Sequence, residues 1–464
     1  MDKTVFALIY TFFVIIGLPV VSVAQIQVPD NGVPDKPNPL IINQLPPRNP
    51  FDSLTFDQAD TYRYIDSILH QGKYDQMKRI QESLLAGEAR MGWFTFDLSR
   101  VKRYNQFEGL YLGAGGYTNA DLFRSVSIGG YAGYGFKDLK TKYGFDVSVW
   151  PDKNQHVTVK AGHSYDTRES GGNLFFDEKS GVFDPASFRF FYVKKMDYEQ
   201  KSTLSVSFKQ NSIRFYGALQ RRMIERGYDI SNGTQVILPD RYNVSGIVAG
   251  IRFAPGEMTT GFVDNNDSKR SRFPVISFQV TRGIPGMFKG EYNYNRYEGK
   301  ILTIRNIKHL GRSSLQLIGN LLQGNAPYFE YFNGRGTFGD FGLYASGSFV
   351  TMHPDEFMND KSVGLFFTHN FGDLIYHSVV SNPSPVLVFN YGWGKLQKNP
   401  TGYLLPAMDM HKGFVEAGIQ INNLLDLKVY GIGLGAYYRM GAYSNSIARE
   451  NLVFKIVISF PGKD

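Results

Sequence analysis

The residues that could do chemistry are scattered along the chain, and one acidic group stands out among them. Asp355, Glu356 and Asp360 place their carboxylates within one short stretch. Carboxylate oxygens are the ligands that a hard cation such as Ca²⁺ prefers. Carboxylates at this spacing also pair with arginines or lie in a solvated loop, and we favour those roles. The sequence therefore predicts no metal site, with a bound cation as the alternative.

Serine and histidine residues near the same region raise the question of an enzyme. A serine, a histidine and a polar orienting residue on a barrel wall are sufficient for a lipid hydrolase, and Ser362 or Ser381 could combine with His369 or His377. The chain has no G-x-S-x-G elbow, no P-loop and no H-E-x-x-H motif. Because any large barrel offers such combinations by chance, we predict no catalytic residues and no cofactor.

Two further charges stand on the polar faces of predicted strands near the C-terminus. Glu416 and Arg439 alternate there with apolar residues. Since neighbouring side chains of a strand point to opposite faces, both charges should point into the lumen of a barrel. We predict that they form an ion pair that stiffens the wall.

Glu108 is open to two interpretations. If Leu110 and Leu112 face lipid, Glu108 shares their face and must lie at the rim of the barrel. If Tyr111 and Tyr117 face lipid instead, Glu108 points inward. Glycines alternate through this stretch, and the sequence leaves both alternatives open.

A two-residue rhythm organises the part of the chain that must position these side chains. Leu204, Val206 and Phe208 alternate with polar residues, and the same pattern runs through 145–149 and 415–422. The polar faces carry glycines and charges that the dry core of a soluble sandwich would not tolerate. Aromatic residues gather at segment ends, as they do at the lipid–water boundary of membrane barrels. We therefore predict an all-β fold, a transmembrane antiparallel β-barrel.

Strand counting gives about 16 strands, with one candidate segment too many for a closed barrel. Two neighbouring segments must belong to one strand, or one segment must be a loop. The predicted strands include 287–297, 299–308 and 341–352.

The final predicted strand gives the sharpest pattern in the sequence. One face is apolar and ends in an aromatic residue, and it consists of Leu452, Phe454, Ile456, Ile458 and Phe460. This arrangement resembles the C-terminal targeting strand that the outer-membrane assembly machinery recognises. A generic amphipathic strand is the alternative.

The N-terminus reads as an export signal. Residues 1–24 hold a lysine, an apolar stretch and small residues just before the predicted cleavage between Ala24 and Gln25. A membrane anchor is the alternative, but the stretch is short of the ~20 residues that a helical span needs. Secretion of this kind favours the cell outer membrane of a Gram-negative bacterium.

Three regions follow the signal. Residues 25–56 are rich in Pro, Asn and Asp and predict a flexible tether. Residues 57–100 have apolar residues at three- and four-residue spacings and predict a helical segment at the periplasmic mouth or inside the barrel. A dimerising helical hairpin is the alternative for that segment. Residues 101–460 form the predicted barrel.

Composition excludes several classes of function. The chain has no cysteine, which rules out disulfides, thiolate metal sites and cysteine nucleophiles. The formal net charge is +8, but basic and acidic residues are interspersed. Nucleic-acid binding needs a concentrated basic stripe, so we predict no nucleic-acid partner.

Several stretches resemble an uncharacterised Bacteroidetes-type family of outer-membrane β-barrels, often fused to an N-terminal carboxypeptidase-regulatory-like domain. The resemblance runs from about Asp57 to Phe460, and its clearest stretches are Ile65–Arg100, Asn105–Asn119, Gly129–Gly144, His353–Gly372 and Gly413–Leu425. It implies that Glu108, Glu356, Phe357 and Asp360 are family-motif positions.

The chain departs from that family in one domain and at one residue. The regulatory-like domain is missing, and the Pro-rich tether stands in its place. Tyr111 occupies a position where the family commonly has arginine. The family has no established activity, so the resemblance supports fold and location only.

These observations favour a non-catalytic role in transport, assembly or envelope organisation. The expected partners are outer-membrane lipid, the assembly machinery during biogenesis, and periplasmic proteins. A porin-like passive diffusion channel is one alternative, for which Ser164–Pro185 is a candidate constriction loop. A barrel-wall hydrolase acting on lipid is the other.

Overall fold

The computed structural model describes residues 87–152, 154–173, 175–176, 185–228, 241–256, 273–339, 342–372, 381–397, 408–427 and 430–459. All of them belong to the second of the two units into which the chain divides, Ser83–Asp464. The predicted signal peptide with its cleavage at Ala24 and Gln25, and the predicted tether, lie outside the described residues. No helix among the described residues is long and apolar enough to cross a membrane.

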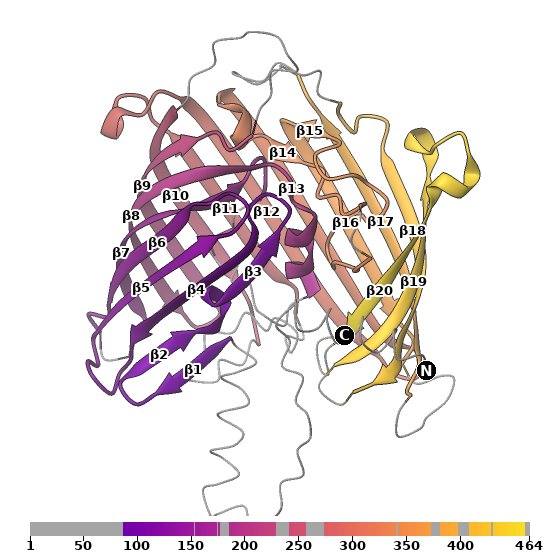
Figure 1. Cartoon of the computed structure of the whole chain (residues 1–464), viewed down its shortest axis with the longest axis horizontal. Coiled ribbons are helices and arrows are strands. Elements are labelled where there is room, and N and C mark those ends of the chain that lie inside the picture. The colour runs from indigo at the N-terminus through magenta and orange to yellow at the C-terminus, as the bar shows by residue number, and fades with distance from the viewer. Residues whose placement is uncertain are drawn as a thin grey trace, which may run out of the picture. The chain divides into compact units, whose positions relative to one another are not determined.

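One antiparallel sheet of 18 strands contains most of the described residues, and its order follows the sequence (Figure 1). Its first half comprises β1 (Glu88–Met91), β2 (Phe94–Asp97), β3 (Lys102–Asn105), β4 (Gly109–Thr118), β5 (Val126–Gly135), β6 (Thr141–Val149), β7 (Val157–Glu169), β8 (Met196–Gln210) and β9 (Ile213–Glu225). Its second half comprises β10 (Arg241–Phe253), β11 (Val275–Gly283), β12 (Asn293–Ile307), β13 (Gly311–Asn325), β16 (Lys361–Asn370), β17 (Ser384–Lys395), β18 (Phe414–Asp426), β19 (Gly431–Met440) and β20 (Leu452–Ser459).

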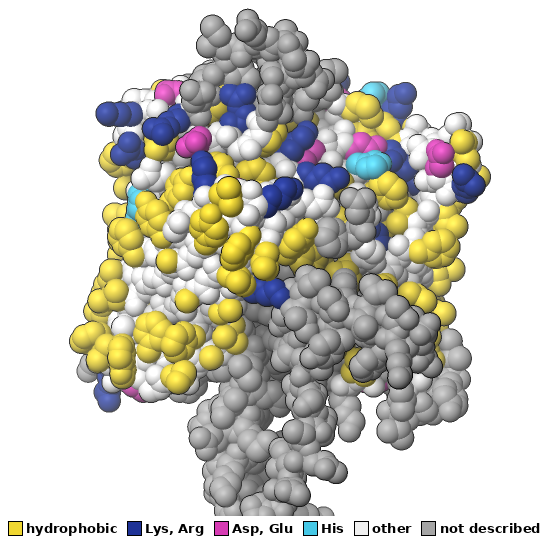
Figure 2. Space-filling view, in the orientation of Figure 1, with side chains coloured by type: hydrophobic (Ala, Val, Ile, Leu, Met, Phe, Trp, Pro, Cys, Tyr) yellow, Lys and Arg dark blue, Asp and Glu magenta, His cyan; other side chains and the backbone are white. Residues whose placement is uncertain are grey.

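The two faces of the sheet have opposite polarity, as the alternation predicted. Leu204, Val206 and Phe208 of β8 are exposed, whereas Ser205 between them is buried. On β18, Ile419 is 60% exposed and Glu416 is 0% exposed. Figure 2 shows hydrophobic side chains spread over the flanks of the molecule. The apolar face therefore points outward and the polar face inward, and the predicted all-β fold of a transmembrane antiparallel barrel is confirmed.

The connections differ in length between the two ends of the sheet. At one end, the long-loop end, strands are joined by 170–195, 226–240, 326–360 and 396–413. At the other, the short-turn end, the connections 211–212 and 308–310 are short, although 254–274 and 371–383 at this end are longer. Because β20 runs toward the short-turn end, the last described strand finishes there.

The sheet has 18 strands where about 16 were predicted. Two predicted segments are lost, one at β12 and one after β13, while β1, β2 and β3 are three strands that the sequence analysis did not predict. Predicted segments 287–297 and 299–308 belong largely to one strand, β12. Predicted strand 341–352 is not a strand of the wall but part of the connection between β13 and β16. That connection contains its own two-stranded sheet, β14 (Phe332–Asn333) with β15 (Met358–Asn359).

The sheet begins earlier than the sequence indicated. The predicted helical segment 57–100 is wrong at its C-terminal end, where residues 88–97 form β1 and β2. Gly92 adopts φ +57, a left-handed conformation that turns the chain between these strands and that a helix cannot contain. β2 and β3 both pair with β4, on either side of a short 3-10 turn (Leu98–Arg100). The earlier part of the predicted helical segment, through residue 86, lies outside the described residues.

Two connections from the long-loop end fold into the lumen. Residues 326–360, which we call the lumen segment, pack against the inward face of the strands through Phe349, Met352 and Phe357. The 3-10 helix η3 (Pro185–Tyr192) belongs to the connection between β7 and β8 and buries Phe188 and Tyr192. The interior of the sheet is thus occupied by the protein's own chain.

The two borders of the sheet, β1–β3 and β20, are not joined to each other by any strand pair among the described residues. The lumen segment covers part of the β20 border instead. The Ile456 amide donates to the Gly342 carbonyl at 2.5 Å, and the Tyr344 amide donates to the Ile456 carbonyl at 2.9 Å. On the opposite border, the Gln106 amide donates to the Val193 carbonyl at 3.1 Å, just after η3. Interior chain therefore bridges the borders from inside.

Candidate functional site in the lumen

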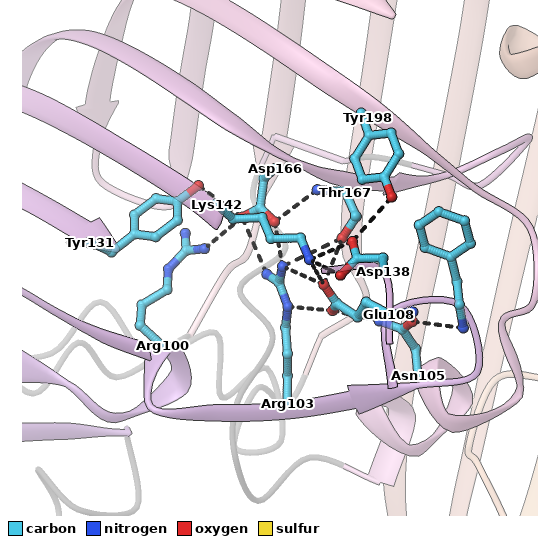
Figure 3. A network of polar contacts seen from close by, with 11 residues as sticks. Arg100, Arg103, Asn105, Glu108, Tyr131, Asp138, Lys142, Asp166, Thr167 and Tyr198 are labelled. Carbon is cyan, nitrogen blue, oxygen red and sulfur yellow. Dashed lines mark hydrogen bonds and ion pairs between the residues drawn. The ribbon is translucent and has the colours of Figure 1, made fainter. Parts of the chain in front are cut away.

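A network of charges lines the inward face of β3 to β8 (Figure 3). The Asp166 carboxylate accepts hydrogen bonds from Arg103, from Arg100 at 3.4 Å and from the Tyr131 hydroxyl at 2.8 Å. Arg103 also holds Glu108, with Nε 2.7 Å from Oε1 and Nη2 3.1 Å from Oε2. A bidentate arginine of this kind fixes the geometry of the carboxylate that it binds. The network joins strands far apart in sequence.

Glu108 is fully buried at the centre of this network. Its carboxylate lies 3.1 Å from the Lys142 ammonium and accepts from the Asn105 amide at 2.6 Å. Lys142 is itself fully buried and lies 2.6 Å from Asp138. Each charge therefore has an opposite charge beside it, which a buried ion needs.

The orientation of Glu108 is now settled. Leu112 is 43% exposed and Tyr111 is 0% exposed, so the leucines of β4 face outward. Glu108 precedes β4 in the turn after β3, and Gly109 follows it with φ +67. The left-handed glycine breaks the alternation, so Glu108 lies at the rim yet turns inward.

Tyr111, where the resembling family commonly has arginine, lies beneath an arginine from the neighbouring strand. The Arg103 guanidinium carbon is 4.1 Å from the centre of the Tyr111 ring. Such a cation–π contact places a positive charge over the ring. A guanidinium therefore lies next to position 111, but Arg103 of the neighbouring strand supplies it.

A second network anchors the start of the lumen segment. Glu330, on the 3-10 turn η6 (Tyr328–Glu330), lies 2.5 Å from Arg222, 3.2 Å from Arg296 and 3.4 Å from Arg168. These arginines come from β9, β12 and β7, and Glu199 and Glu298 complete the balance of charge. One carboxylate of the lumen segment is therefore clamped by three different strands.

Glu416 holds the middle of the lumen segment. Its carboxylate accepts from the backbone amides of Val350 and Thr351, both at 2.8 Å, and from the Thr351 hydroxyl at 2.7 Å. The Asn390 amide of β17 donates to it at 2.7 Å. The predicted inward orientation of Glu416 is correct, and its role is to bind inserted backbone.

Arg439 points inward as predicted, but the predicted pairing with Glu416 is wrong. Although Glu416 and Arg439 stand opposite each other on β18 and β19, Arg439 pairs with Glu356 of the lumen segment, with Nη2 2.6 Å from Oε1. The inserted segment offers Arg439 a carboxylate, whereas Glu416 is already occupied by amide donors. Neighbouring positions in the ladder did not determine the partner.

The acidic residues of the lumen segment do not converge on one point. The Asp360 carboxylate accepts from the Gln397 amide at 2.6 Å, while Glu356 binds Arg439 and the His353 amide. Phe357 is 1% exposed and packs on Phe414 and Tyr443. Among the described residues, no group of His, Asp and Glu is arranged to hold a metal ion.

Asp355 lines a small cavity between the lumen segment and the connections 170–195 and 226–240, together with Ser170, Lys195 and Tyr228. Burial, together with the nearby Glu169 carboxylate, raises the pKa of Asp355 to about 6. This residue is therefore partly protonated in mildly acidic solution.

Lys455 and Tyr192 secure the lumen segment beside the β20 border. The Lys455 ammonium donates to the Tyr192 hydroxyl and to the Thr337 carbonyl, both at 3.0 Å. The Tyr192 hydroxyl in turn donates to the Leu343 carbonyl at 2.5 Å. Sequence reasoning missed both residues, although a lone lysine in the otherwise apolar stretch of β20 was an available signal.

The pairing of Ser362 with His369, one of the combinations considered as an alternative, is not formed. Ser362 is buried on the inward face of β16, while His369 lies at an alternate, outward position. His369 Nε2 lies 2.9 Å from the Leu310 carbonyl oxygen, and His377 lies outside the described residues. Instead, the Ser313 hydroxyl is 2.8 Å from His369 Nδ1, and the Ser202 hydroxyl is 2.8 Å from His163 Nδ1.

The predicted targeting face of the last strand is exposed over most of its length. Leu452, Phe454 and Ile456 are 42%, 70% and 38% exposed. Ile458 is 2% exposed, and Phe460 lies outside the described residues. Recognition of this strand by an assembly machinery stays a prediction.

Comparisons with known proteins give distant structural similarities. The chain is similar to BamA from Haemophilus ducreyi lacking POTRA domains 1–3, at 12% identity and a TM-score of 0.47, over 77% of this chain and 68% of that one. It is also similar to CdiB from Escherichia coli (12%, TM-score 0.46, 77% and 60%). CdiB from Acinetobacter baumannii gives 11% identity and a TM-score of 0.43, over 77% and 58%. The chain thus spans about three fifths of the two CdiB chains. No protein-family model and no curated protein matches it.

Proposed function

We propose that this protein is an integral β-barrel of the outer membrane with a non-catalytic role in transport or assembly. Its short turns would face the periplasm and its long loops the outside, as in other bacterial barrels. The resemblance to the Bacteroidetes-type barrel family is part of this proposal.

The occupied lumen is the observation that carries the proposal. Arg222, Glu416 and Arg439 bind the lumen segment from three parts of the wall. An open diffusion channel needs a continuous water-filled lumen, whereas this interior is filled by inserted chain. A barrel closed at rest and opened by displacement of that chain suits a gated role. The borders of the sheet add to this, because unpaired strand edges can accept another chain.

Conductance in planar bilayers tests the proposal. The wild-type protein should give closed or noisy traces, and a steady ohmic pore would overturn it in favour of the porin-like alternative. Because the chain has no cysteine, a disulfide can be introduced without background. Asn390 donates to the Ser348 carbonyl at 3.4 Å, so Ser348→Cys with Asn390→Cys should lock the lumen segment. The oxidised double variant should stay closed, and reduction should make openings more frequent, because Asn390→Cys also removes a hydrogen-bond donor to Glu416.

A lipid hydrolase is the second candidate, favoured by one outward-facing group. The His163 ring lies between Ser202 at 2.8 Å and the Gln200 amide at 3.4 Å. Phospholipid hydrolysis by the purified protein that disappears in Ser202→Ala would establish this alternative. We expect no turnover, since no described carboxylate orients the His163 ring.

A further inference from the structure

Two lysines stand directly opposite each other on the outward face, at the long-loop end. Lys361 begins β16 and Lys395 ends β17, and the two residues are cross-strand partners. Val363, their outward neighbour on β16, is 44% exposed, which places Lys361 on the same face by alternation. Side chains in such positions have Cβ atoms about 5 Å apart, and like charges there destabilise the strand pair.

Neither lysine forms an ion pair with a described carboxylate. The acidic residues nearest to the lysines in sequence bind backbone amides instead. Asp360 accepts from the Gln397 amide, and Asp409 accepts from the Leu396 amide at 3.1 Å. The chain between these points, residues 398–407, contains Lys398 and no Asp or Glu. The cationic pair is therefore left for an external anion.

The surroundings of the pair indicate where that anion lies. On the same face, the next cross-strand partners are Val363 and Trp393, and the partners after them are Leu365 and Tyr391. All four residues lie farther from the long-loop end than the lysines do. Tyr391 is 37% exposed. Tryptophan and tyrosine mark the lipid–water boundary of membrane proteins, and lysine side chains extend from the apolar zone to reach headgroups. The pair thus stands at headgroup level above an apolar and aromatic surface.

We propose that Lys361 and Lys395 bind the phosphate of a phosphorylated lipid in the leaflet at the long-loop end. The phosphate lies between the two ammonium groups and relieves their repulsion, while Trp393, Val363 and Leu365 contact the acyl chains. The inference rests on the proposed membrane location and adds a lipid class to it. Figure 2 shows other Lys and Arg side chains toward the same end of the molecule.

Lipid binding to the full chain in neutral detergent tests this inference. Native mass spectrometry would compare phosphatidic acid with phosphatidylcholine of the same acyl chains. The wild-type protein should prefer phosphatidic acid. Each Lys→Gln change should weaken that binding about fivefold, and Lys361→Gln with Lys395→Gln about twenty-five-fold, with phosphatidylcholine unaffected. Equal binding by the double variant would overturn the inference.

Three controls make the result specific. Arg305→Gln removes an exposed cation of β12 near the short-turn end and should change nothing. An equal loss in that variant would overturn the site, because any surface cation would then suffice. Lys361→Arg with Lys395→Arg should keep the binding. Free glycerol 3-phosphate at the same concentration should not compete, and competition would overturn the assignment to a lipid.

Stability without lipid gives an independent readout. In neutral detergent, Lys395→Gln should unfold at the same temperature as the wild type or a higher one, since it removes like-charge repulsion. A lower unfolding temperature of Lys395→Gln would contradict the absence of an ion pair at Lys395. A protein that needed no detergent would overturn the membrane location. A detergent-dependent protein whose lipid binding ignored both lysines would overturn only this inference.

Discussion

Two parts of the inner wall use buried carboxylates in different ways. On the wall of β3 to β8, Glu108 and Asp166 bind Arg103 and other side chains of neighbouring strands and turns. On the wall of β16 to β20, Glu416 and Arg439 bind the lumen segment instead. The first arrangement holds the wall to itself, and the second holds an insert to the wall. Variants on the two walls should therefore differ in what they loosen.

The largest effect is expected at Glu108. Glu108→Gln removes one carboxylate from beside the fully buried Lys142 and the partly buried Arg103, which should lower the free energy of unfolding by about 3–5 kcal/mol. Urea unfolding in lipid vesicles, followed by heat-modifiability, measures it. Glu291→Gln, whose carboxylate binds the exposed Asn243 amide, is the control and should cost little. A loss of less than about 1 kcal/mol in Glu108→Gln would contradict the proposal that this network stabilises the wall.

Glu416→Ala should come next, with a different signature. Removing the carboxylate leaves the Val350 and Thr351 amides without their acceptor, at about 2–4 kcal/mol. The lumen segment should loosen, so channel openings in planar bilayers should become more frequent. Ile419→Ala, on the outward face of the same strand, should leave conductance unchanged. Unaltered heat-modifiability and conductance in Glu416→Ala would refute the anchoring role.

A double-mutant cycle can identify the true partner of Arg439. Glu356 and Arg439, which form a mostly buried bidentate pair, should show a coupling energy of about 1–2 kcal/mol. Glu416 and Arg439, which are ladder neighbours without an ion pair, should show about 0.5 kcal/mol or less. Both cycles use Gln substitutions and the unfolding measurement above. Reversal of the two values would restore the pairing that the sequence suggested.

The smallest effect concerns pH and Asp355. Burial raises the pKa of this carboxyl to about 6 from its ordinary value of 3.8, so its protonated form is favoured in the folded protein. The unfolded chain ionises first as the pH rises, and stability should fall between about pH 4 and 6. Asp355→Asn should remove this fall and stabilise the protein at pH 7 by about 1–2 kcal/mol. An unchanged pH profile would show that Asp355 is solvated.

Local patterns predicted the faces of the wall correctly. Glu416, Arg439 and Ile419 lie on the expected sides because alternation is a property of any strand. The pattern failed where a glycine with positive φ interrupts it, at Gly92 before β2 and at Gly109 after Glu108. Sequence also could not separate segment 341–352 from a wall strand, because its apolar residues pack on the lumen side of the strands.

The sequence by itself determined that this chain forms strands with one apolar and one polar face, since the two-residue period is encoded locally. Only the tertiary structure decided what the polar face binds. Asp166 lies 63 positions from Arg103, Glu356 lies 83 positions from Arg439, and Arg168 lies 162 positions from Glu330, separations that no local pattern spans. The wall is thus a local property of the sequence. How the lumen is filled depends on the contacts between the lumen segment and side chains of distant strands.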